Sequence, residues 1–203
     1  MKNPSIPTPY VVADWRLRMQ AIYAAVRAEA DPERGWHLWH EKRSALYRDH
    51  PATPLAQAVN FTAIPVSPYD PAWCFAVDLE PHDGEALRYD LGADGAMHAR
   101  PIARTIGLKD VLQQELTLYF LEGYGGGAFL PFADTAPTSY PGGRYLVDAI
   151  KGQDLGLDAD NRLILDFNFA VTPSCAWNPA YVCPLAPPAN RVKVPVSAGE
   201  LRP

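Results

Sequence analysis

The hydrophobic pattern of this chain changes its period near residue 60, and this change limits the possible folds more than any other feature. Before it, apolar residues recur every three or four positions, which indicates helices. After it, apolar and polar residues alternate in short runs, which indicates half-buried strands. Two helices followed by about eight short strands predict a mainly β, α+β protein: an antiparallel β-barrel or strongly bent sheet with two N-terminal helices.

At 203 residues, one hydrophobic core can serve the whole chain, so we expect a single domain over residues 1–203. Residues 1–12 are rich in proline and are predicted as an extended arm, residues 13–50 as a helical pair, and residues 60–200 as the barrel with a proline-rich C-terminal loop.

The first helix is predicted to begin after Asp14 as N-cap and to end near Ala30, because the following Asp31-Pro32 disfavours helical geometry. The second should run from about Gly35 to His50-Pro51. Helical spacing gives each helix one face that should pack on the body of the fold. These faces comprise Trp15, Met19, Ile22, Tyr23 and Val26 in the first helix, and Trp36, Trp39, Arg43, Leu46 and Tyr47 in the second.

Alternation and turn residues place the expected strands at residues 73–79, 87–91, 98–108, 115–122, 128–133, 144–150, 162–168 and 191–196. The glycine run at residues 123–127 lies between two of them. Phosphate loops open onto a helix, so a hairpin turn is the better interpretation. The 21 prolines are dispersed among apolar residues and predict stiff loops and strand edges. Pro195 should place the last strand at an edge.

The net charge of -5 argues against a nucleic-acid surface, which normally carries a basic patch. No segment has the roughly 20 apolar residues of a membrane helix, and the N-terminus does not resemble a secretory signal. We therefore expect a cytoplasmic protein without membrane contact. Its three cysteines fit that compartment, where thiols are usually reduced. Neither a cofactor nor an oligomeric state is indicated.

Charged residues lie at the ends of three expected strands. Asp134 ends one strand and Arg144 begins the next, and the loop between them contains Thr135 and Tyr140. If the strand at 162–168 is the next antiparallel neighbour, Asp166 and Asn168 come level with Arg144. We therefore expect one polar opening of the barrel, formed by Asp134, Thr135, Tyr140, Arg144, Asp166 and Asn168.

Such an opening suits a small molecule with a carboxylate, which Arg144 would bind through two parallel hydrogen bonds. An enzyme is the first alternative, of hydrolase or lyase type, with Asp134 or Asp166 as base and Glu200 as a further carboxylate. The second alternative is a structural or interaction domain, in which an Arg–Asp pair only closes the end of the barrel.

Cys175 and Cys183 stand in the proline-rich loop, too far apart in sequence for a CxxC motif. They could form a disulfide in an oxidising setting, or join His37 and His40 at a zinc ion, although paired histidines on a helix surface are more often not ligands. No neighbour in the sequence marks either thiol as an activated nucleophile. We expect no metal site.

The segments FADTAPTSYPGGRYL and LDFNFAVTPSCAWNPAYVCPLAPPANR and the closing VSAGE resemble bacterial and archaeal domain-of-unknown-function family 1684. The segment WHEKRSALYRDHPATPLA is similar to the family's N-terminal helix and the loop after it. The resemblance implies no established activity. It places family residues at Asp134, at residues 143–145 and 166–168, and at Cys175 and Cys183. The chain departs from the pattern at Ala136-Pro137, and at residues 170–173, where the family usually has Ala-Tyr-Asn-Pro.

Overall fold

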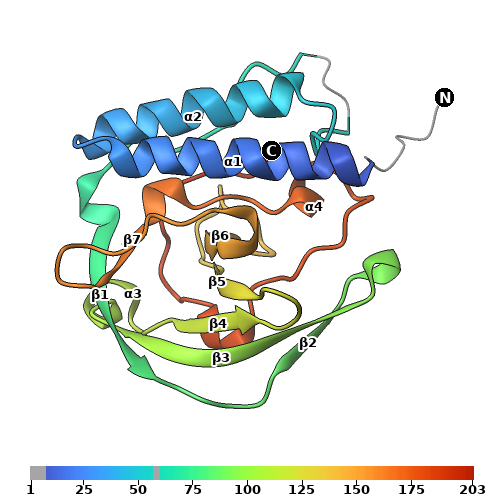
Figure 1. The fold of residues 1–203 in the computed structure, drawn as a ribbon. Helices are drawn as coiled ribbons and strands as arrows, with labels where there is room; N and C mark the ends of the chain where they lie inside the picture. Colours follow the sequence, from blue (N-terminus) through green and yellow to red (C-terminus); the bar gives the residue numbers. More distant parts are fainter. Residues whose placement is uncertain (1–7, 57–59) are drawn as a thin grey trace.

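Two long antiparallel helices cover one side of a curved antiparallel sheet in the computed structural model of the protein, which describes residues 8–56 and 60–203 (Figure 1). Helix α1 spans Pro9–Ala28 and α2 spans Pro32–Asp49. Both predicted packing faces are confirmed: nine of their ten residues are buried, and Trp15 is half-buried. No helix in the described part of the chain combines the length and apolarity needed to cross a bilayer.

The start of α1 differs from the prediction. Residues 9–12, expected in an extended arm, form its first turn, with Thr8 as N-cap and Pro9 at the first helical position. Proline suits that position because its missing N–H would have no helical partner there. Asp14 therefore lies within the helix, and its carboxylate accepts hydrogen bonds from Arg18 and His50. Residues 1–7 of the expected arm lie outside the described residues.

Helix α2 begins three residues before the prediction because Asp31 is an N-cap. Its carboxylate accepts hydrogen bonds from the backbone N–H groups of Glu33 (3.0 Å) and Arg34 (3.2 Å). Pro32 occupies the first helical position, and His50 is the C-cap.

Seven antiparallel strands form the sheet in the described residues, in the order β6-β5-β4-β3-β1-β7 with β2 paired to β3. An antiparallel bridge between Tyr145 of β6 and Val171, five residues beyond β7, nearly closes the sheet into a barrel. The predicted fold class is thus confirmed. The strands are β1 (Cys74–Pro81), β2 (Leu87–Asp90), β3 (Ala96–Ile106), β4 (Thr117–Leu121), β5 (Gly127–Phe132), β6 (Arg144–Asp148) and β7 (Leu163–Asp166).

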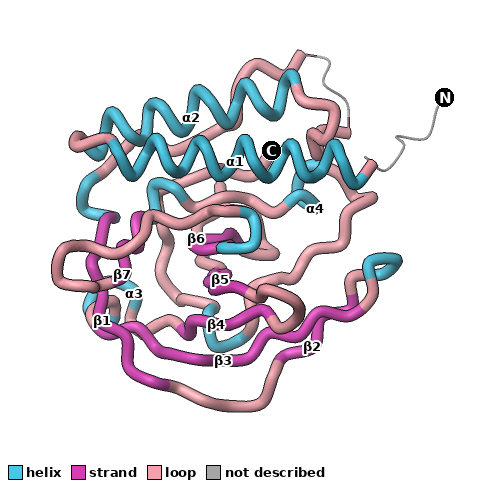
Figure 2. Tube along the Cα trace, viewed as in Figure 1, coloured by secondary structure: helices cyan, strands magenta, loops and turns pink. Residues whose placement is uncertain are grey.

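The expected eighth strand at residues 191–196 does not form. Arg191 makes one isolated parallel bridge to Ala133, and Pro195 has no N–H to extend a ladder. Figure 2 shows that the chain after β7 is mostly loop, with short helical turns such as α4 (Ser174–Trp177). The last segment instead contacts the fold through single hydrogen bonds, for example from the Thr135 N–H to the Val194 carbonyl (3.3 Å).

The glycine run is a hairpin between β4 and β5, as predicted, with Leu121 paired to Gly127. Gly126 has a φ of +43°, and a Cβ there would overlap the Phe120 ring and lie 2.8 Å from the Leu121 carbonyl oxygen. Glycine is therefore required both for the backbone conformation and for the space.

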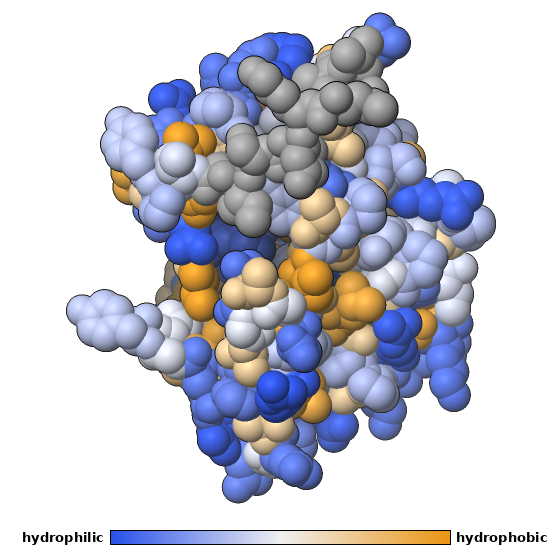
Figure 3. Space-filling view, turned by 90° about the vertical axis from the view of Figure 1, so that its right-hand side faces the viewer, coloured by the Kyte–Doolittle hydropathy of each residue, from blue (hydrophilic) through white to orange (hydrophobic). Residues whose placement is uncertain are grey.

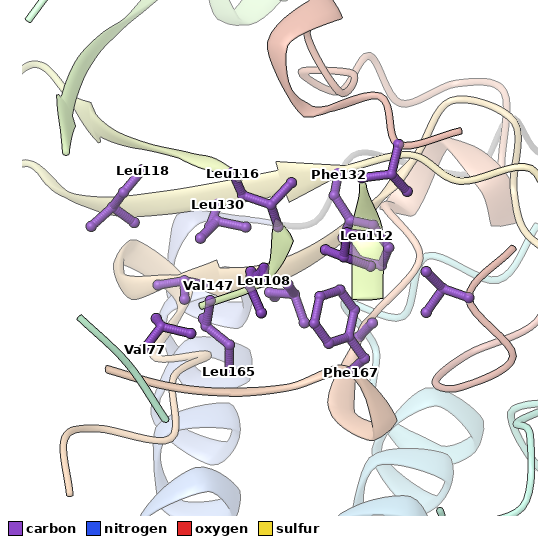
Figure 4. Close-up of a cluster of buried hydrophobic side chains, with 14 of the residues drawn as sticks. Val77, Leu108, Leu112, Leu116, Leu118, Leu130, Phe132, Val147, Leu165 and Phe167 are labelled. Carbon is purple, nitrogen blue, oxygen red and sulfur yellow. The ribbon is translucent and has the colours of Figure 1, made fainter. Parts of the chain in front are cut away.

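The two faces of the sheet bury different cores. Phe129 and Tyr145 face the helices, where they pack with Trp39 and Phe169. The opposite face encloses the barrel interior, and Figure 4 shows its side chains pointing toward one another from several strands and from the short helix α3 (Lys109–Leu112). The interior is filled by Val77, Leu108, Leu112, Leu116, Leu118, Leu130, Phe132, Val147, Leu165 and Phe167.

Candidate functional site

Arg144 and Asp134 form a buried ion pair. Arg144 begins β6 opposite Phe132 of β5, and Asp134 follows β5 by two residues. The distance from Arg144 Nη2 to Asp134 Oδ2 is 2.8 Å, and both side chains are 1% exposed. The pair expected from the ends of these two strands is therefore present.

The remaining Arg144 hydrogen bonds go to the C-terminal segment, which we define as residues 196–202. Nη2 donates to the carbonyl of Val196 (3.2 Å), and Nη1 donates to the carbonyls of Ala198 and Glu200. Only Nε has no acceptor within the described residues. Burial lowers the pKa of Arg144, and the Asp134 carboxylate opposes this shift. The guanidinium is thus already occupied by the protein itself.

Asp134 is equally occupied. Its Oδ1 accepts hydrogen bonds from the Ala136 N–H (2.8 Å), the Ser139 hydroxyl (3.1 Å) and the Val196 N–H (3.2 Å). These bonds fix the loop after β5 against the C-terminal segment. Thr135, in the same loop, is exposed.

Asp166 and Asn168 form a second cluster. Asp166 ends β7, and its Oδ1 accepts hydrogen bonds from the backbone N–H (2.9 Å) and side-chain Nδ2 (2.7 Å) of Asn168. Asn168 also donates to the Asp70 carbonyl and accepts from the Asp70 N–H. Burial raises the pKa of Asp166, partly offset by the hydrogen bonds from Asn168. The cluster joins the chain before β1 to the turn after β7.

We expected the strand that ends in Asp166 to lie beside the strand that begins with Arg144. This expectation is wrong, because β7 pairs with β1 and not with β6. The Phe132 ring contacts both the Arg144 guanidinium (5.1 Å from Cζ to the ring centroid) and the Phe167 ring (5.1 Å between centroids). No hydrogen bond or ion pair within residues 8–56 and 60–203 joins Asp134 or Arg144 to Asp166 or Asn168. The structure thus holds two separate polar clusters.

Tyr140 belongs to a third cluster, with the two cysteines of the proline-rich loop. Its hydroxyl lies 3.7 Å from Cys175 Sγ, and the Cys175 N–H lies 3.4 Å from Cys183 Sγ. Both thiols are free and half-buried. We call these three residues, together with Lys151, whose charge acts on both thiols, the thiol site.

The thiol site has the electrostatics of a reactive cysteine. The neighbouring Cys183 thiol, aided by the Tyr140 hydroxyl and the charge of Lys151, lowers the pKa of Cys175 to about 6 despite the opposing effect of burial. The neighbouring Cys175 and burial raise the pKa of Cys183. The sequence shows no activating neighbour because Tyr140 and Lys151 lie 35 and 24 positions before Cys175.

The scaffold fixes the proline-rich loop on both sides of the cysteines. The Tyr145 hydroxyl donates to the Pro184 carbonyl (2.7 Å), and the Ala186 N–H donates to the Gly142 carbonyl (3.0 Å). At the other end, the Trp177 indole donates to the Thr172 hydroxyl (2.8 Å). The path of the loop after Cys183 is therefore set by β6 and by the turn before it.

Glu200, a further carboxylate in the sequence analysis, is fully buried and paired. Its Oε1 accepts from Arg43 Nε of α2 (2.5 Å), and its Oε2 accepts from the N–H and hydroxyl of Thr172 (2.7 Å each). Arg43 also donates to the Tyr47 hydroxyl (2.9 Å). This network joins the helical layer to the barrel, which is a structural role.

The zinc alternative is not supported. His40 Nε2 lies 2.8 Å from the Ile64 carbonyl oxygen, and the His37 ring packs against the Trp36 ring. No three His, Cys, Asp or Glu residues in the described part of the chain are arranged to hold a metal ion. His37 and His40 therefore do not complete a site with the cysteines.

An open cleft of about 450 Å³ runs along α1 and α2, and Asp14, Arg18, Lys42 and His50 are among its lining residues. Asp14 is already paired with both Arg18 (2.9 Å) and His50 (2.9 Å). None of the six predicted site residues lines this cleft or a second one beside β3.

These features define an α+β protein with a filled, nearly closed barrel, two structural polar clusters and one surface thiol site. The family model described as "Protein of unknown function (DUF1684)" matches residues 59–201, and the chain belongs to this family, which confirms the resemblance seen in the sequence. No curated protein matches the chain.

The fold has a counterpart among solved structures. The solution NMR structure of an uncharacterised protein from Haloarcula marismortui is 24% identical and has a TM-score of 0.53. The match covers 80% of this chain and 89% of that chain. At this level of identity, the likeness supports the fold alone.

Proposed function

We propose that this protein binds a small molecule at the thiol site and reacts with it through Cys175. The observation that carries the proposal is the half-buried position of Cys175, whose Sγ lies 3.7 Å from the Tyr140 hydroxyl and whose N–H lies 3.4 Å from Cys183 Sγ. A thiolate is the nucleophilic form of cysteine. The lowered pKa of Cys175 raises its thiolate fraction at neutral pH above the few per cent of an ordinary thiol.

The structure gives less support to a carboxylate ligand bound by Arg144 at the opening of the barrel. The interior is filled with apolar side chains, and such a ligand would have to displace Asp134 and leave that carboxylate buried without its partner. Among the residues expected in the site, Tyr140 is the one that carries over to the thiol site. For an acidic ligand there, Lys151 supplies the cation, with its side chain 39% exposed and its ammonium 2.7 Å from Asp148.

The hydrolase- or lyase-type alternative has weaker support. Asp134 is held in its ion pair, and Asp166 accepts two hydrogen bonds from Asn168. A general base must reach the proton that it removes, and neither carboxylate lines a described cleft. We also propose a cytoplasmic location, supported by the three free thiols.

The proposal is tested by the rate at which each cysteine is alkylated by iodoacetamide at pH 7, followed by peptide mass spectrometry. Cys74 is an internal reference, because burial raises its pKa to about 12. We expect Cys175 to react at least about tenfold faster than Cys74, and Tyr140→Phe to slow Cys175 selectively. Equal rates for the two residues would overturn the proposal.

The charge preference is tested with iodoacetate, the acidic counterpart of iodoacetamide. If Lys151 recruits acidic ligands, Lys151→Met should lower the iodoacetate rate at Cys175 more than the iodoacetamide rate. Lys193→Met, at an exposed lysine of the last loop, is the matched control and should change neither rate. An unchanged ratio in Lys151→Met would contradict the acidic-ligand part of the proposal.

A further inference from the structure

We propose that Cys175 and Cys183 form a two-thiol centre that reduces small organic disulfides, with Cys175 as the attacking thiol and Cys183 as the resolving thiol. This inference rests on the reactive Cys175 of the proposed function and adds a substrate class and a second catalytic residue. The residues are eight positions apart, the Cys175 N–H donates to Cys183 Sγ (3.4 Å), and neither thiol is in a disulfide.

The reaction takes two exchange steps. The Cys175 thiolate attacks one sulfur of the substrate disulfide, so that a Cys175–substrate S–S bond forms and the other half leaves as a thiolate, which takes up a proton. Cys183 then gives its proton to solvent and attacks Cys175 Sγ. A Cys175–Cys183 bond forms, and the second half of the substrate leaves as a thiolate and is protonated. Two electrons pass from the protein dithiol to the substrate disulfide.

The different environments of the thiols assign their roles. Cys175 Sγ lies 3.7 Å from the Tyr140 hydroxyl, which can donate to its thiolate. The neighbouring Cys175 and burial raise the pKa of Cys183, so Cys183 keeps its proton until Cys175 is bound in a mixed disulfide. The neighbouring charges are Lys151 and its partner Asp148, and Lys151 acts on both thiols.

The loop geometry favours the second step. The Trp177 bond to Thr172 spans Cys175, and the Tyr145 bond to Pro184 holds the loop directly after Cys183, so Cys183 stays near Cys175 while the mixed disulfide exists. An intramolecular thiol held close to its target competes effectively with thiols from solution. Resolution within the protein should therefore be faster than release of the adduct by free thiol.

The surface around the thiol site suits a small organic disulfide. The loop after α4 lies on the right-hand side of Figure 1, the side that faces the viewer in Figure 3, where apolar residues gather near the centre. On this loop, Val182 is 54% and Leu185 is 41% exposed. Together with Lys151, they offer apolar contact and one positive charge, which matches a disulfide that bears carboxylates.

The test treats the reduced full-length protein with oxidised glutathione and follows the products by intact-protein and peptide mass spectrometry. We expect the wild type to lose two hydrogens, to form the Cys175–Cys183 bond and to release two equivalents of glutathione. Cys183→Ser should instead accumulate a glutathione adduct at Cys175 and release one equivalent. Cys175→Ser should react at least tenfold more slowly, and Cys74→Ser should behave as the wild type.

Two negative results have different meanings. If the wild type alkylates rapidly at Cys175 but only accumulates the glutathione adduct, the two-thiol reaction is wrong and the proposed function stands. If Cys175 reacts with neither iodoacetamide nor glutathione disulfide, both are wrong. Thermal unfolding of each variant shows whether it folds, and Cys183→Ala repeats the trapping experiment if Cys183→Ser does not.

Discussion

Arg144 holds the C-terminal segment to the sheet through hydrogen bonds to three backbone carbonyls, while Asp134 balances its charge. Arg144→Met removes the donors and leaves a buried carboxylate without its partner. We expect a loss of about 3–5 kcal/mol in the free energy of unfolding, measured by urea denaturation. Arg104→Met, at an exposed position of β3, is the control and should cost less than about 0.5 kcal/mol. A similar small loss in both variants would contradict the structural role of Arg144.

Single residues also show what the sequence can and cannot indicate about a site. Asp134 and Arg144 end and begin neighbouring strands, so their contact follows from a short-range pattern and could be predicted. The sequence could not predict that the other Arg144 donors are also paired, because their acceptors lie 52 to 56 positions later, in a segment without regular structure. The thiol site was missed for the same reason: Tyr140 reaches Cys175 only through the path of the proline-rich loop.

At the scale of elements, the hydrophobic period and the turn residues were sufficient to predict both long helices and seven strands. The prediction failed where other interactions replaced the hydrogen bonds of strand pairing. Residues 191–196 alternate like a strand, but Pro195 and single bonds to the loop after β5 keep them irregular. The order of the strands could not be predicted from the sequence either, because the pairing of β1 with β7 joins segments about 90 positions apart.

The connection between β3 and β4 depends on Glu115. Its carboxylate accepts hydrogen bonds from the N–H groups of residues 107–109 and from the Thr105 hydroxyl (2.6 Å). Burial alone would raise the pKa of Glu115, but these hydrogen bonds outweigh it and the pKa is lowered. The folded state therefore favours the charged form, which connects the stability of this element to pH.

A carboxyl group whose pKa is lower in the folded state stabilises the fold fully when the pH is above its unfolded-state pKa of about 4.3. This stabilisation is lost as the pH falls through the folded-state pKa. Glu115→Gln should therefore cost about 1–2 kcal/mol at pH 7, and the difference from the wild type should shrink below about pH 4. Urea denaturation at several pH values measures this. Glu122→Gln, in an exposed ion pair with Arg100, should cost under about 1 kcal/mol at pH 7. A pH-independent cost at Glu115 would refute the charge-based explanation.

At the scale of the whole molecule, two layers with separate cores are joined through Glu200. The aromatic face of α2 predicted that Arg43 would point inward, yet its partner lies 157 positions away. A buried arginine needs acceptors, but the sequence does not indicate which residue supplies them. The carboxylate lies in the same segment that Arg144 holds by its carbonyls, so residues 196–202 contact the helices through one arginine and the barrel through another.

This arrangement predicts strong coupling between Arg43 and Glu200. Arg43→Met or Glu200→Gln alone leaves a buried group without its partner and should cost about 3–5 kcal/mol, whereas the double variant should cost clearly less than the sum. Arg34→Met and Glu29→Gln, which break a surface ion pair at the connection between α1 and α2, should be additive and nearly neutral. Urea denaturation followed by both circular dichroism and tryptophan fluorescence gives the four energies of each cycle. It also shows whether the layers unfold together. Additive losses at Arg43 and Glu200 would mean that the two layers are joined by apolar packing and not by this ion pair.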